Sequence, residues 1–180
     1  MSGSRAAAAL LLLSISLVES GCGLGEFDVQ RQIPEQRVAG SALGGLLDGF
    51  LEVPIPLDVD VEAEVAARDA GPAQAVRLSR LDFSVTAGAM TPPDEDDFAF
   101  LRSATVYVES ERDGSELPRV MVAQLPGPGA GRNLEFATET SVDLLPYVEE
   151  GARFVSEANA NVPPDDVTFN GRFRITIEVF

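Results

Sequence analysis

The chain has 180 residues, with 29 Asp and Glu against 13 basic residues, so its formal net charge is −16 at pH 7. Because binding to phosphate needs a positive surface, this balance argues against nucleic acid as a partner. The chain has no His, which excludes His-dependent catalytic triads and, with a single Cys, conventional zinc sites. All 13 basic residues are Arg, so the chain also lacks the lysine of a Walker A loop or of a Schiff base. No cofactor is expected.

The first 21 residues have the organisation of an export signal. Arg5 and the amino terminus supply positive charge, and the run Ala6–Val18 that follows carries no charge. As a helix this run spans only about 20 Å, whereas the hydrocarbon core of a bilayer is about 30 Å thick. A basic start, a short apolar stretch and then small residues are typical of a signal peptide, so residues 1–21 are predicted to be removed.

The only cysteine, Cys22, follows this segment directly. Ser20-Gly21-Cys22 resembles the lipobox of bacterial lipoproteins, in which a cysteine receives a diacylglyceryl group, although Glu19 stands where an aliphatic residue is usual. The resemblance implies cleavage before Cys22, acylation of its sulfur and a stable anchor, because two acyl chains hold a protein on a bilayer. In Gram-negative lipoproteins, an Asp directly after the acylated cysteine signals retention in the inner membrane. Gly23 occupies this position, so the sequence resembles that of a lipoprotein sorted to the outer membrane. The alternative is ordinary cleavage after Ser20, which leaves a free thiol in an oxidising compartment.

Two segments without strand character come next. Residues 22–40 have little periodicity and are predicted to be a lipid-anchored tether, ahead of a single domain that occupies residues 41–180. Between positions 41 and 51, apolar side chains recur at helical spacing and Ser41 is a suitable N-cap, which predicts a short helix. Its glycines weaken it as an isolated helix. We expect it to cover one end of the core, because it has no basic polar face; the alternative is that it rests on the membrane beside the anchor.

The following two segments are predicted to be strands. Within residues 54–68, apolar and acidic residues alternate from Asp58 to Val65, with three valines and one alanine on one face and Asp or Glu on the other. After a turn at 69–72 the apolar residues resume. Their phase slips by one residue between Leu78 and Leu81, and this slip predicts a β-bulge.

A hairpin is predicted in the middle of the chain. Strand-like residues 105–110 and 117–125 lie on either side of the turn signal Asp113-Gly114. Residues 133–139 then have the composition of one short strand.

A second short helix is predicted over residues 143–150. Asp143 can cap its start, and Pro146 falls in the first turn, where its missing N–H does no harm. Gly151 can end it.

The last part of the chain is rich in strand signals. Residues 154–162 are a strand candidate, and residues 167–180 combine an Asn170-Gly171 turn signal with a final strand whose apolar residues alternate. In total we count seven to eight strands with short turns and brief helices. The predicted fold is therefore all-β, an antiparallel β-sandwich of immunoglobulin-like size with one or two short helices.

Two acidic loops are the candidates for a binding site. Loops 94–97 and 165–166 each follow a Pro-Pro pair, and acidic loops at the tip of a sandwich can bind calcium or simply stay solvated. Asp94-x-Asp96 opens like a calcium loop, but Phe98 occupies the next ligand position and no Gly supplies the bend. The calcium candidates are Asp94, Asp96, Asp97, Asp165 and Asp166.

Catalysis is a third hypothesis. Without His or Lys, only a pair of carboxylates remains as catalytic machinery, as in glycoside hydrolases. Sugar-binding surfaces use Trp and Tyr, but Trp is absent and only Tyr107 and Tyr147 are available. No catalytic residue is therefore assigned, and the chain is predicted not to be an enzyme.

Several segments carry a resemblance to a family. With DFAFLRSATVYVES, LPRVMVAQL, PYVEEGAR and VPPDDVTFNG, the chain resembles an uncharacterised group of bacterial lipoproteins that have a short leader, a lipobox and one β-rich domain. On strand pattern alone it is more distantly similar to the sandwich of type 2 late-embryogenesis-abundant proteins. The resemblance implies a location and a fold without implying a reaction.

These observations lead to a ranked set of expectations. The first is a non-enzymatic lipoprotein of the cell envelope, structural or protein-binding, held by acylated Cys22 on the outer rather than the inner membrane. Its partners would be the membrane and another envelope protein. The second is a calcium- or glycan-binding surface module that uses loops 94–97 and 165–166, and the third is a carboxylate-based hydrolase.

Overall fold

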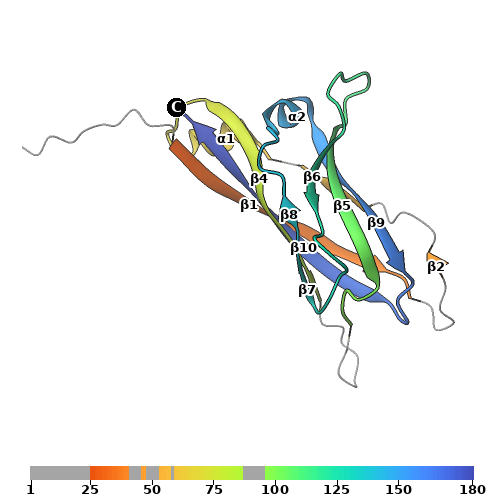
Figure 1. Ribbon diagram of the computed structural model, residues 1–180. Helices are drawn as coiled ribbons and strands as arrows, with labels where there is room; N and C mark the ends of the chain where they lie inside the picture. The colour runs from red at the N-terminus through yellow and green to blue at the C-terminus, as the bar shows by residue number, and fades with distance from the viewer. Residues whose placement is uncertain (1–24, 41–45, 48–52, 58, 87–95) are drawn as a thin grey trace, which may run out of the picture.

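The computed structural model describes residues 25–40, 46–47, 53–57, 59–86 and 96–180. Its strands form two sheets packed face to face (Figure 1). Sheet A has the order β1 (Gly25–Val38), β10 (Val167–Val179), β4 (Ala73–Val85) and β7 (Asn133–Glu135). Sheet B has the order β2 (Leu46–Leu47), β9 (Ala152–Asn161), β5 (Leu101–Ser110), β6 (Val120–Gln124) and β8 (Ala137–Thr138), and β3 (Val53–Pro56) also pairs with β9.

Every pair of neighbouring strands is antiparallel. The predicted fold class, an all-β antiparallel sandwich, is confirmed. The described residues contain ten strands rather than seven to eight. Part of the difference is that residues 133–139, expected as one strand, divide into β7 in sheet A and β8 in sheet B, so the chain changes sheets there.

Apolar side chains of the two sheets fill the space between them. The predicted alternation in the last strand is confirmed, because Phe173, Ile175 and Ile177 of β10 are all buried on the inner face. Phe154 of β9 meets them from sheet B, and its ring packs edge-on against that of Phe173 with 5.5 Å between centroids. Edge-to-face packing of this kind adds to the gain from burial.

The turn predicted at Asn170-Gly171 is wrong. β10 runs through both residues and pairs there with β1 and with β4. Gly171 serves packing instead, because a Cβ at this position would lie 2.5 Å from Cδ1 of Phe83. The Phe83 ring is in turn held edge-on by Phe136 and Phe169.

Two local predictions are confirmed. The pairing of β4 with β10 shifts register at Ser79, so a bulge lies between Leu78 and Leu81 and both leucines face the core. β5 and β6 form the predicted hairpin. Gly114 in its turn has φ of 76°, a conformation that favours glycine.

The predicted tether over residues 22–40 is wrong for residues 25–38, which form the 14-residue strand β1 along the edge of sheet A. Val29 and Ile33 face the core, but Arg31 occupies the same face between them and interrupts the apolar alternation. A bulge between Ile33 and Gln36 then shifts the phase by one residue. These two features conceal the strand in the sequence.

The strand predicted within residues 54–68 is wrong from Val61 to Ala66, because these residues form the helix α1 (Val61–Ala66). Asp60 caps the helix, since its Oδ1 accepts the backbone N–H of Ala63 at 2.8 Å. Val61 and Val65, which satisfy a strand period, are also four residues apart and so share a helix face.

The two predicted helices at 41–51 and 143–150 differ in outcome. Residues 41–45 and 48–52 lie outside the described residues, and Leu46–Leu47 form strand β2, so the first helix is wrong for those two residues. α2 (Leu145–Glu150) lies inside the second range and ends at Gly151, whose φ is 83°. Within the described residues, no helix is both long and apolar enough to cross a membrane.

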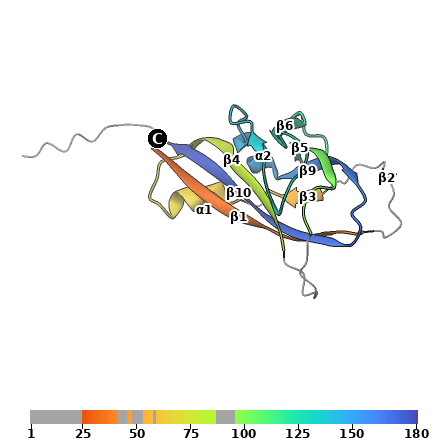
Figure 2. The ribbon, with the colours of Figure 1, turned by 60° about the horizontal axis from the view of Figure 1, so that its bottom comes forward.

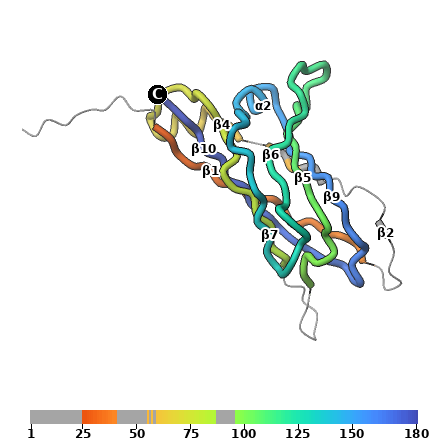
Figure 3. Tube along the Cα trace, in the orientation of Figure 1, coloured from red at the N-terminus to blue at the C-terminus, as the bar shows by residue number. Residues whose placement is uncertain are grey.

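The two ends of the sandwich carry different segments. At one end β1 begins, β10 ends, and α1 lies close by (Figure 2). At the other end β1 finishes and β10 begins, so the first and last strands run side by side along sheet A (Figure 3). The two ends of the sandwich therefore expose different segments of the chain.

Candidate functional site

The predicted lipidation residue, Cys22, lies outside the described residues, and so does Asp94. The first described residue is Gly25, which begins β1 only three positions after Cys22. The other calcium candidates belong to the described part of the chain, at the end of the sandwich where β10 begins: Asp96, Asp97, Asp165 and Asp166.

A hollow of about 510 Å³ opens at this end. It lies between residues 96–100, which lead into β5, and residues 161–167, which connect β9 to β10. The two segments meet because β5 and β9 are antiparallel neighbours, and the N–H of Asn161 donates to the carbonyl oxygen of Phe100 at 2.8 Å. The sandwich thus brings the two acidic loops together.

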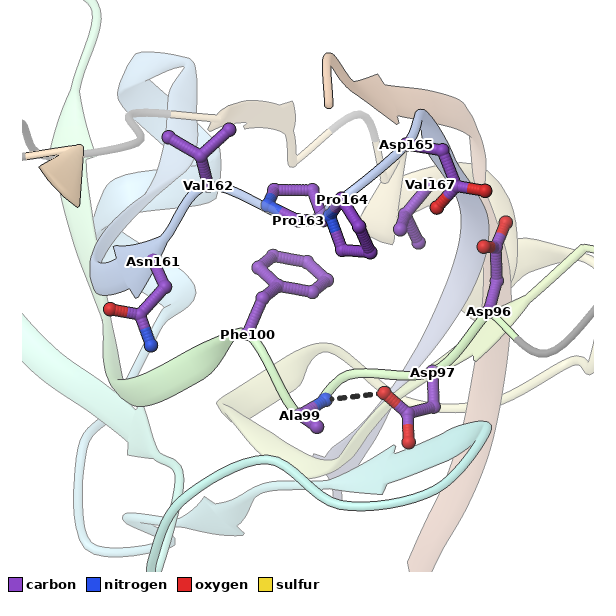
Figure 4. Close-up of a pocket in the computed structure, with 10 residues that line it drawn as sticks. All are labelled: Asp96, Asp97, Ala99, Phe100, Asn161, Val162, Pro163, Pro164, Asp165 and Val167. Atoms are coloured by element: carbon purple, nitrogen blue, oxygen red, sulfur yellow. Dashed lines mark hydrogen bonds between the residues drawn. The ribbon is translucent and has the colours of Figure 1, made fainter. Parts of the chain in front are cut away.

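The hollow has one acidic side. In Figure 4, Asp96, Asp97 and Asp165 stand opposite Asn161. Oδ1 of Asp97 accepts the N–H of Ala99 at 2.9 Å, which closes a turn at the mouth. The rest of the wall is apolar and consists of Ala99, Phe100, Val162, Pro163, Pro164 and Val167.

Asp166 does not line this hollow, because it joins the end of β1 to the start of β10. Its carboxylate pairs with Arg37 and accepts the N–H of Gly40 at 2.9 Å. The N–H of Gly40, followed by the guanidinium of Arg37, lowers the pKa of Asp166 below its usual value. The residue is exposed, so its effect on stability is screened by solvent.

The described acidic residues of the hollow do not form a metal site by themselves. Among the residues that the structure describes, no three His, Cys, Asp or Glu side chains are grouped so that they could hold a metal ion. Calcium takes about six to eight oxygen ligands. The arrangement offers a negatively charged, partly apolar concave surface.

An aromatic cluster lies beneath the hollow. Phe98 packs against Phe100 and, edge-on, against Phe169 of β10. Phe100 lines both the hollow and a small apolar cavity of about 40 Å³ between the sheets. No local pattern marks Phe100 or Asn161 as site residues, because their position at the hollow depends on the pairing of β5 with β9.

Neither tyrosine lines the hollow. The hydroxyl of Tyr147 donates to the carbonyl oxygen of Pro118 at 2.7 Å, and burial raises the pKa of Tyr147. The ring of Tyr107 lies under the guanidinium of Arg119, with 4.3 Å from the guanidinium carbon to the ring centroid. The two side chains suited to sugar stacking are thus engaged elsewhere.

Comparison with known proteins supplies no family. No family model matches the chain, and no curated protein matches it. Among solved structures it is similar to the decameric BFDV capsid protein, with 8% identity and a TM-score of 0.43 over 88% of this chain and 99% of that one. It is also similar to a structure of desmodium yellow mottle tymovirus, with 12% identity and a TM-score of 0.30 over 100% of this chain and 96% of that one. A third similar structure is that of mud crab tombus-like virus, with 7% identity and a TM-score of 0.33 over 97% of this chain and 90% of that one. At these TM-scores the similarities carry no argument about function.

Proposed function

We propose that this protein is a non-enzymatic lipoprotein of the cell envelope, attached to the outer membrane through acylated Cys22. The observation that carries the proposal is the Ser20-Gly21-Cys22 sequence, which directly follows a short uncharged apolar run. A folded strand begins at Gly25, only three positions later. Two acyl chains on Cys22 would hold the sandwich at the bilayer surface.

A binding role suits the sandwich better than a catalytic one. The chain has no His and no Lys, and both tyrosines are packed away from the hollow. The hollow offers carboxylates and apolar side chains, which are suited to contact with a partner protein. The structural or protein-binding role is therefore the one that we propose for the domain.

The mass of the intact protein tests the anchor. The full chain is expressed in a Gram-negative host, extracted from membranes with detergent and analysed by mass spectrometry. We expect a mature chain that starts at Cys22 and carries the added mass of its acyl groups. A chain that starts at Gly21 without lipid would refute the proposal.

The matched control is Cys22→Ser, which removes only the sulfur. This variant should move from the detergent phase to the aqueous phase, because the described part of the chain is a charged, folded domain. Unchanged partitioning of a Cys22→Ser chain whose mass shows that residues 6–18 have been removed would show that membrane attachment does not depend on Cys22.

A further inference from the structure

Three segments that are far apart in the sequence meet at the end of the sandwich where β1 begins. Gly25 pairs with Val179, and Val179 pairs with Ala73. The turn between α1 and β4 closes this end, because a Cβ on Gly71 would lie 2.6 Å from the carbonyl oxygen of Phe180. We call residues 25–27, 68–73, 179 and 180 the N-terminal rim.

The N-terminal rim exposes apolar surface. The side chain of Phe180 is 70% exposed, and it is one of two large hydrophobic residues exposed in the described part of the chain. Pro72 is exposed beside it in the turn. Phe27 is half-buried, with the guanidinium carbon of Arg68 lying 4.3 Å from the centroid of its ring. The rim thus presents aromatic and aliphatic groups together with one arginine, Arg68, and two exposed carboxylates, those of Glu26 and Asp69.

We infer that the N-terminal rim rests on the bilayer that carries the lipid anchor, with Phe180 in the headgroup region. This inference depends on the proposed acylation of Cys22. The three residue steps from Cys22 to Gly25 span at most about 10 Å even when fully extended. The anchor therefore keeps this end of the sandwich against the membrane surface. The exposed ring of Phe180 is a group suited to the interface, and the Arg68 guanidinium over the half-buried ring of Phe27 adds a cation there.

The sandwich stands on this rim rather than lying flat. Its outer faces carry ion pairs such as Arg77 with Glu178 and Arg172 with Asp82, at 2.7 and 2.6 Å between their closest atoms. A flat orientation would take such groups out of water, which is unfavourable. The net charge of −16 also repels an anionic lipid surface. Both effects favour a small area of contact with the bilayer, and the rim is the part of the sandwich that the proposed anchor would hold there.

The upright orientation places the acidic hollow far from the membrane. β1 has 14 residues, and at about 3.3 Å per residue it extends roughly 45 Å from the rim to the opposite end. The hollow at that end is then presented to the surroundings rather than to lipid. A partner of the proposed function would approach from there.

The absence of tryptophan makes this orientation measurable with one introduced fluorophore. Phe180→Trp and Pro72→Trp place the probe at two exposed positions of the rim. Gly127→Trp is the matched control in the loop between β6 and β7, where an added Cβ meets no atom within 4 Å. This loop lies at the opposite end, since Gly129 bonds to the carbonyl oxygen of Leu101 at the start of β5.

Each variant is made in the full, acylated chain and reconstituted into vesicles of phosphatidylcholine brominated near the carboxyl end of its acyl chains. We expect the two rim probes to lose about half of their fluorescence relative to unbrominated vesicles, because interfacial side chains sit roughly 5–10 Å into the boundary of headgroups and chains. The probe at position 127 should be unchanged. Two rim variants are used so that a folding defect in one does not decide the outcome.

The outcomes separate the orientation from the anchor itself. Intact mass and flotation with the vesicles are measured first, and an unacylated chain removes both the proposed function and this inference. If the chain is acylated but neither rim probe is quenched, the inference is overturned while the anchor stands. Equal quenching at all three positions would mean that the sandwich lies flat, which also overturns it.

Discussion

The carboxylate of Glu64 in α1 accepts a hydrogen bond from the guanidinium of Arg31 in β1, with 2.7 Å between Oε1 and Nη2. Its other oxygen, Oε2, accepts from Arg68 at 2.6 Å. One carboxylate therefore connects the helix that covers the end of sheet A to the edge strand of that sheet. Arg31 would otherwise be a charge among the core-facing positions of β1.

These contacts predict that acid destabilises the protein. The bond from Arg31, followed by the bond from Arg68, lowers the pKa of Glu64, and hydrogen bonds also lower the pKa of Glu150 and Asp166. A carboxyl whose pKa is lowered by folding stabilises the fold above its unfolded pKa and loses this contribution as pH falls through the folded pKa. The free energy of unfolding, measured with urea, should be level down to about pH 5 and decline below that.

Glu64→Gln is the control for this pH dependence. The variant should be less stable than the unaltered protein at neutral pH, and the difference should shrink in acid, where Glu64 is protonated in both states. A difference that stays constant down to pH values below the usual carboxyl pKa would show that Glu64 acts through packing alone.

Gly171 is predicted to be intolerant of any side chain. Gly171→Ala would place a Cβ 2.5 Å from Cδ1 of Phe83 and 2.9 Å from the carbonyl oxygen of Asp82. Phe136 and Phe169 pack edge-on against the Phe83 ring, so the ring can move away only by disturbing them or by entering the small apolar cavity that it lines. Overpacking of this kind costs about 1–3 kcal/mol of unfolding free energy.

Gly127→Ala is the matched substitution, because a Cβ there meets nothing within 4 Å. Its unfolding free energy in urea should stay within about 0.5 kcal/mol of the unaltered protein, as for most surface changes. Equal losses for the two variants would show that the contact with Phe83 is not what requires glycine at position 171.

Asp143 connects α2 to sheet A and provides a third prediction. Its Oδ1 accepts the backbone N–H of Val76 in β4 and that of Leu145 in α2, both at 3.0 Å. Asp143→Ala leaves two part-buried donors without this acceptor and should cost about 1–3 kcal/mol in urea unfolding. Asp143→Asn keeps an acceptor oxygen and should recover most of the loss, whereas equal losses would indicate that the charge itself is needed.

The fold class could be predicted from the sequence because most of the strands signal themselves locally. The last strand alternates regularly, and the slip in β4 was enough to locate a bulge. β1 could not be predicted, because the residue that satisfies Arg31 is Glu64, 33 positions away. α1 was missed because Val61 and Val65 suit either a strand or a helix, and the deciding contact is the cap from Asp60.

The candidate site was predictable in its residue types but not in its shape. Both acidic loops, each after a Pro-Pro pair, were predicted as candidates for a binding site, yet their convergence depends on the pairing of β5 with β9, which no local pattern reveals. The same pairing brings in Phe100 and Asn161. Asp166 does not join the hollow, because its carboxylate forms an ion pair with Arg37 near the end of β1, a strand that could not be predicted from the sequence.

The final prediction concerns calcium at the acidic hollow. Asp166 is directed to Arg37 and Gly40, and Asp97 accepts the N–H of Ala99, whereas calcium needs about six to eight oxygens in one shell. We therefore expect the Tm of the protein to be the same in chelator and in millimolar calcium. A site with a Kd ten times below the calcium concentration would instead raise the unfolding free energy by about 1.4 kcal/mol. A rise in Tm that grows with calcium and disappears in Asp165→Asn would assign cation binding to the hollow, and it would make the calcium-binding module the better account of the domain.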